Sequence, residues 1–97
     1  MINIKLSKQV GTFAENKDIA RRIRLEKILP ALKKKQKVVL DFEGIDSTTQ
    51  SFIHALISDL IRKYGTDVLS KISFKSCNPT IQKIITIVID YMQESEY

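Results

Sequence analysis

Apolar residues alternate with polar ones, or form a short run, at three places in the chain, and each place predicts a β-strand. Residues 2–6 alternate and so put their apolar side chains on one face. Residues 37–42 are nearly all apolar, which is typical of a central strand covered on both faces of a sheet. Residues 71–75 alternate again. Residues 10–13 are a weaker candidate for a strand that forms a hairpin with the first.

The first helix is predicted to begin near Lys17, because apolar residues then recur at helical spacing and Asn16 can serve as the N-cap. Pro30 lies inside this pattern. A proline removes a backbone hydrogen bond and clashes with the carbonyl four residues earlier. We therefore expect a kink or a break near Leu29.

The second helix, over residues 47–64, has the clearest apolar stripe in the sequence. Ser47 and Gln50 have the spacing of a capping box, so Ser47 is the expected N-cap. Gly65 is placed to end the helix.

A third helix is expected after Asn78, as N-cap, and Pro79, as first-turn residue. Its inward stripe would consist of Ile81, Ile84, Ile85, Val88 and Met92, although the β-branched residues 84–89 would equally suit a strand. Strands that alternate with helices indicate the α/β class. We expect one domain, residues 1–97, with a small mixed β-sheet of about four strands flanked by about three helices.

The chain has 97 residues and no apolar run near the 20 residues that cross a bilayer. The first residues lack the features of a secretory signal, so we expect a cytoplasmic protein. Cys77 and His54 are the single cysteine and the single histidine. A disulfide within the chain is therefore excluded, as is a zinc cluster of Cys and His.

Sequence motifs of common enzymes are absent: there is no glycine-rich phosphate loop, no HExxH and no GxSxG. Ser51, His54 and Asp59 would form a hydrolase-like set only on a solvated helix face, with nothing to exclude water. We therefore expect no enzymatic activity, no catalytic residue, no metal and no cofactor.

The helix over residues 47–64 has mostly small side chains opposite its apolar stripe, at Ser51, Ala55, Ser58 and Arg62. Short side chains let another protein approach closely. Hydroxyl groups at the start of a helix also suit phosphorylation, because the helix dipole favours a phosphate there. The alternative is that these hydroxyls only cap the helix and the small residues face solvent.

Residues 38–45, VVLDFEGI, followed by residues 46–52, DSTTQSF, resemble the STAS-like family related to anti-anti-sigma factors. The resemblance covers about residues 16–92. It implies a small mixed sheet flanked by helices, and a histidine-kinase-like ATPase partner that phosphorylates Ser or Thr at the start of the helix after the central strand. Aligned without gaps, Gln50 occupies the usual acceptor position; aligned on residues 46–48, the acceptor is Ser47.

The leading hypothesis is a regulatory module that docks such a partner through the start of this helix. The candidate phosphoacceptors are Ser47, Thr48, Thr49 and Ser51. The candidate docking residues are Asp46, Gln50, His54, Ala55, Ser58 and Arg62.

The alternative hypothesis is a nucleic-acid-binding protein, because the chain has a net charge of +5 and its basic residues are concentrated in residues 17–37. The candidate patch consists of Arg21, Arg22, Arg24, Lys33, Lys34, Lys35 and Lys37. No aromatic residue for base stacking lies among them. The partner and the oligomeric state stay open.

Overall fold

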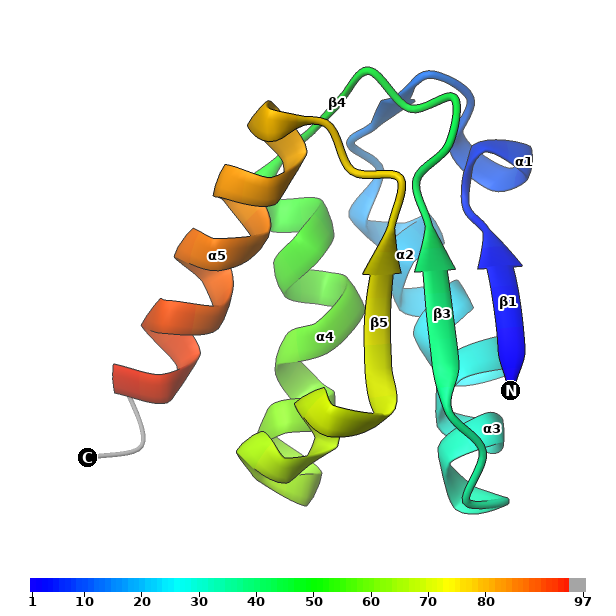
Figure 1. The fold of residues 1–97 in the computed structure, drawn as a ribbon, viewed down its shortest axis with the longest axis vertical. Helices are drawn as coiled ribbons and strands as arrows, with labels where there is room; N and C mark the ends of the chain where they lie inside the picture. The colour runs from blue at the N-terminus through cyan, green and yellow to red at the C-terminus, as the bar shows by residue number, and fades with distance from the viewer. Residues whose placement is uncertain (95–97) are drawn as a thin grey trace.

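The computed structural model describes residues 1–94, and its main sheet consists of three parallel strands in the order β1-β3-β5 (Figure 1). The strands span Ile2–Lys5 for β1, Val38–Asp41 for β3 and Ile72–Lys75 for β5. Leu40 of β3 lies opposite Ile4 on one side and Phe74 on the other. The predicted central strand is confirmed.

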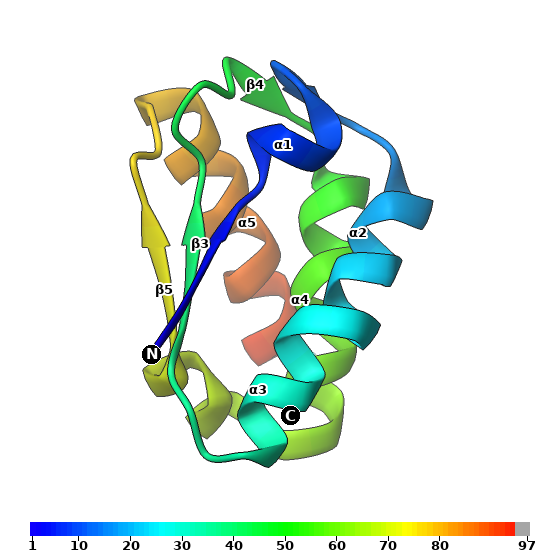
Figure 2. The ribbon, with the colours of Figure 1, turned by 90° about the vertical axis from the view of Figure 1, so that its right-hand side faces the viewer.

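The helices cover one face of this sheet (Figure 2). On the other face, Asn3, Lys5, Ser73 and Lys75 are exposed and Val39 is half-buried. Parallel sheets are ordinarily covered on both faces. The expectation that the central strand is covered on both faces is therefore met only in part.

The predicted hairpin over residues 10–13 is wrong. After β1 the chain forms a short helix, α1 (Ser7–Val10), which Gly11 ends with a φ of 71°. The strand β2 (Phe13–Ala14) then pairs in parallel with β4 (Ser47–Thr48). A glycine with positive φ serves a helix end as well as a hairpin turn, so the sequence did not separate the two.

The first long helical segment changes its hydrogen-bonding pattern before Pro30. It comprises α2 (Lys17–Ile23), a π-helical turn η1 (Arg24–Ile28) and α3 (Leu29–Lys33). Asn16 is the N-cap, as predicted, and its Oδ1 accepts from the amides of Asp18 at 2.9 Å and Ile19 at 3.2 Å. The expected irregularity near Leu29 is the π turn, a common way to absorb an interruption of the helical ladder.

The central helix begins later than expected. Thr49, not Ser47, is its N-cap, and the Thr49 hydroxyl accepts from the Phe52 amide at 3.1 Å. Ser47 is taken up by β4. Gly65 ends the helix as predicted, its amide donating to the Ile61 carbonyl at 2.7 Å. The remaining elements are α4 (Gln50–Tyr64), the 3-10 helix η2 (Thr66–Lys71) and α5 (Pro79–Glu94).

The core lies between the sheet and the helices, with α4 packed between α2 and α5. Within residues 1–94 the structure has five α-helices and two parallel sheets, of three and two strands. The expected three helices and single mixed sheet are corrected accordingly. Four members of the predicted α5 stripe are buried, and Ile84 is half-buried.

Asn78 connects the start of α5 to the loop that precedes β4. Its Oδ1 caps the helix by accepting from the Ile81 amide at 2.9 Å. Its Nδ2 donates to the Asp46 carbonyl at 2.7 Å. One side chain thus fixes both segments at the upper edge of the molecule in Figure 1.

Asn78→Ala should lower the free energy of unfolding by about 1–2 kcal/mol, because it removes both the cap and the link to Asp46. Asn78→Ser keeps a capping oxygen and should lose less. Urea denaturation of both variants measures the difference. Equal stability of both variants and the wild type would contradict the role given to Asn78.

Candidate docking site at the start of α4

A shallow hollow of about 320 Å³ lies between the first turns of α4 and the outer side of α5. Tyr91 is 60% exposed and Ile87 is 40% exposed. The His54 ring lies against the Tyr91 ring, with centroids 6.3 Å apart and planes inclined by 53°. The hollow is lined by Gln50, Ser51, His54, Ile87, Val88 and Tyr91.

The four candidate phosphoacceptors differ in accessibility. Thr48 is buried, and its hydroxyl donates to the Ala14 carbonyl at 2.7 Å. Thr49 is half-buried and its hydroxyl caps α4. Ser47 is half-buried in β4, whereas Ser51 is exposed. Of the four candidate residues, Ser51 is the exposed one, whereas Thr48 is buried where β4 pairs with β2.

The small-residue face of α4 is partly covered by the protein's own α2. Ser58 is buried, so it is not on an open surface. Ala55 is half-buried, and its carbonyl accepts from Arg24 Nη1 at 2.8 Å. The small side chains do allow close approach, but of a helix within the chain. The other candidate docking residues are exposed or half-buried: Asp46, Gln50, His54 and Arg62.

Asp59 is held by two arginines. Arg24 Nη1 lies 3.0 Å from Asp59 Oδ2, and Arg62 Nη1 lies 3.1 Å from Asp59 Oδ1. Both carboxylate oxygens of Asp59 are therefore engaged by arginine side chains.

Arg24 is also misplaced in the predicted basic patch, because its side chain is only 11% exposed. Its side chain connects η1 to α4 through Ala55 and Asp59 instead of facing solvent. The remaining patch residues are exposed: Arg21, Arg22, Lys33, Lys34, Lys35 and Lys37.

Neither a metal cluster nor a membrane span is found in residues 1–94. No group of three His, Cys, Asp or Glu side chains there is placed to hold a metal ion. No helix in the same range has the length and apolar character needed to cross a membrane.

Comparison with family models identifies the fold family. A model described as a STAS-like domain of unknown function (DUF4325) matches residues 20–82. The chain belongs to this STAS-like family. The resemblance carried by residues 38–52 is thereby confirmed, and no curated protein or solved structure matches the chain.

The matched part of the STAS-like domain runs from α2 into the first turn of α5. It includes Gln50, Ser51 and His54 but ends before Ile87 and Tyr91. Sequence reasoning missed these two residues of the hollow. The sequence did contain a signal: Ile87 and Tyr91 are four residues apart, so they share one face of α5, and neither belongs to its inward stripe.

Arg24→Met should lower the free energy of unfolding by about 2 kcal/mol, because a largely buried charged hydrogen bond to α4 is lost. Arg62→Met removes the exposed contact to the same carboxylate and should cost less than about 0.5 kcal/mol. Urea denaturation of the two variants checks the order. A larger loss for Arg62→Met would show that Arg24 does not hold the helices together.

Cys77 should react slowly with iodoacetamide at pH 8. Burial, with a smaller contribution from the Asp41 charge, raises the pKa of the Cys77 thiol and so reduces the thiolate fraction. Asp41→Asn removes the charge and should move the alkylation pH profile to lower pH. A profile at or below that of a free cysteine in the wild type would contradict this prediction.

Proposed function

We propose that this STAS-like domain is a non-catalytic regulatory module that docks a protein partner at the start of α4 and the adjoining side of α5. The observation that carries the proposal is the pairing of two exposed apolar side chains, Tyr91 and Ile87, with exposed polar groups of α4 around one hollow. Tyrosines of this kind often anchor protein interfaces.

The chemistry of the hollow fits a protein better than a small substrate. The Tyr91 ring and Ile87 provide apolar area, and removing that area from water on binding makes the free energy of binding more favourable. Gln50, Ser51 and His54 add donors and acceptors at the rim. The hollow is shallow and open, which suits a partner surface better than an enclosed small substrate.

The proposed partner is a histidine-kinase-like ATPase, the class that the family resemblance implies. Ser51 is the proposed phosphoacceptor, because its hydroxyl is exposed at the second residue of α4. A phosphate there would lie near the free amides of the helix start and beside Tyr91, so it would alter the charge of the docking surface.

The test is to mix the purified chain with a histidine-kinase-like ATPase of the same genome, with ADP or ATP, and to measure binding by calorimetry and phosphate by mass spectrometry. Tyr91→Ala should weaken binding about tenfold or more, as expected for an interface anchor. Leu25→Ala is the matched control, since Leu25 is 47% exposed on η1.

Ser51→Ala should remove the added phosphate without unfolding the domain. Absence of a complex in both nucleotide states would reject the partner class. A complex that tolerates Tyr91→Ala would instead reject the surface.

A further inference from the structure

The strand β1 lies at the edge of the main sheet, opposite the side where α5 extends past β5 (Figure 1). The amides of Ile2 and Leu6 donate to the carbonyls of Lys37 and Asp41, toward β3. In a strand, the backbone N–H and C=O groups of successive residues point alternately to one side of the strand and to the other. The N–H and C=O groups of Asn3 and Lys5 therefore point away from the sheet.

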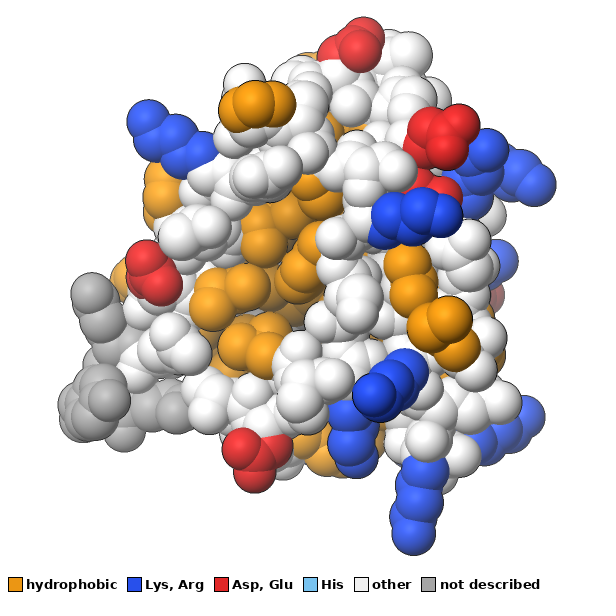
Figure 3. Space-filling view, in the orientation of Figure 1, with side chains coloured by type: hydrophobic (Ala, Val, Ile, Leu, Met, Phe, Trp, Pro, Cys, Tyr) orange, Lys and Arg blue, Asp and Glu red, His pale blue; other side chains and the backbone are white. Residues whose placement is uncertain are grey.

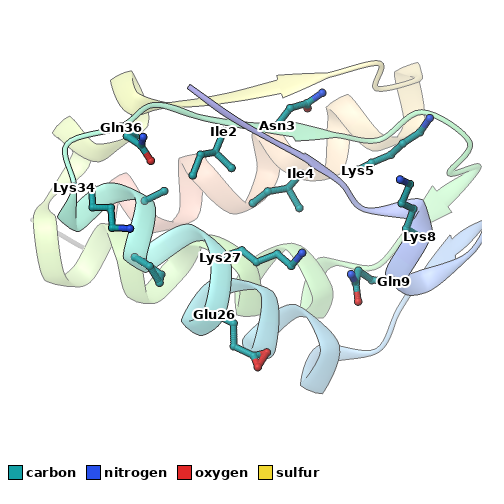
Figure 4. A pocket seen from close by; sticks show the side chains of 12 residues that line it. Ile2, Asn3, Ile4, Lys5, Lys8, Gln9, Glu26, Lys27, Lys34 and Gln36 are labelled. Carbon is teal, nitrogen blue, oxygen red and sulfur yellow. The ribbon is translucent and has the colours of Figure 1, made fainter.

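A groove of about 420 Å³ adjoins this free edge (Figure 4). Its apolar floor consists of the half-buried Ile2 and Pro30, with the buried Ile4 and Ala31 beneath them. Ile2 and Ile4 point from β1 toward the helices in Figure 4. The groove thus offers unpaired backbone groups on one side and a hydrophobic surface below them.

The rim of the groove is positively charged. It carries Lys5, Lys8, Lys27 and Lys34, whereas its single acidic residue, Glu26, points away from β1 in Figure 4. Lys5 lies 4.0 Å from Glu43, at the limit of an ion pair. In the described part of the chain, the other three lysines form no ion pair.

We propose that this groove binds an extended acidic segment of a partner protein, which adds to β1 as a further strand. Its backbone would pair with Asn3 and Lys5, and the side chains on the helix side of the added strand would contact the apolar floor. Acidic side chains on that side would meet Lys8, Lys27 and Lys34, which form no ion pair within residues 1–94, and those on the other side would lie near Lys5. This groove is separate from the hollow between α4 and α5, so a test of one site does not decide the other.

The residues around the groove disfavour two other occupants, a second copy of this chain and a nucleic acid. Lysines on an edge strand repel a second identical edge, so self-association through β1 is disfavoured. Nucleic acid is the other anionic class, but single-strand binding uses aromatic side chains for base stacking, and none of the aromatic residues within residues 1–94 lines this groove. An acidic peptide uses the backbone groups, the floor and the charges together.

The probe is a synthetic hexapeptide, Glu-Glu-Val-Val-Glu-Glu, which places both residue types on each face of a strand and is titrated into the 15N-labelled chain. The expected result is saturable binding that weakens with salt, because the rim charges are exposed. The amides of Asn3 and Lys5 should become protected from hydrogen exchange. The same hexapeptide with Lys in place of Glu, and the acidic peptide with its central amides N-methylated, should not bind.

Lys27→Glu with Lys34→Glu should weaken binding of the acidic peptide about tenfold or more, since two attractive contacts become repulsive. The matched control is Lys71→Glu with Lys83→Glu, two exposed lysines outside the groove that give the same net charge. The control should change affinity less than about twofold, as expected for distant screened charges.

Three results would overturn the proposal: no protection at Asn3 and Lys5, equal loss in both double variants, or a single-stranded oligonucleotide that displaces the peptide and binds more tightly. The last would assign the groove to nucleic acid.

Discussion

The position of α4 between the sheet, α2 and α5 is the constraint on which the other features depend. Six large apolar side chains of α4 are buried: Phe52, Ile53, Leu56, Ile57, Leu60 and Ile61. Each such side chain contributes about 1.5–3 kcal/mol when it leaves water. Ser58 is buried as well, because a short side chain leaves room for a neighbour. The exposed residues of α4 are therefore confined to its first turn, Asp59 and its last three residues, and this limits where a partner can contact it.

The small size of the sheet is the second constraint on the surface of this domain. Three short parallel strands with all helices on one face leave the opposite face and two edges uncovered (Figures 1 and 2). In Figure 3, which views the molecule from the same direction as Figure 1, hydrophobic side chains lie in a hollow beside β5, and basic side chains project at several edges. A small sheet of this kind exposes backbone groups that larger sheets pair internally. The free edge of β1, with its lysines, is one such place.

Charge has two roles in this domain, which composition alone does not separate. Arg24 is largely buried and joins two helices through Asp59 and the Ala55 carbonyl. Lys27 and Lys34, from the same basic stretch of sequence, are exposed beside the β1 edge. A linear count places all three in one basic stretch, residues 17–37. Their separation follows from the different directions in which a helical segment points its side chains.

The sequence by itself determined the α/β class, the central strand, the caps at Asn16 and Asn78, the helix end at Gly65 and the family resemblance. These features depend on neighbours in the chain, through periodicity and capping hydrogen bonds. Tertiary structure alone decided that β2 pairs with β4, that Thr49 rather than Ser47 caps α4, and that Ser58 is covered while Tyr91 is exposed. Each of these depends on segments distant in sequence, whose contacts local propensity does not encode.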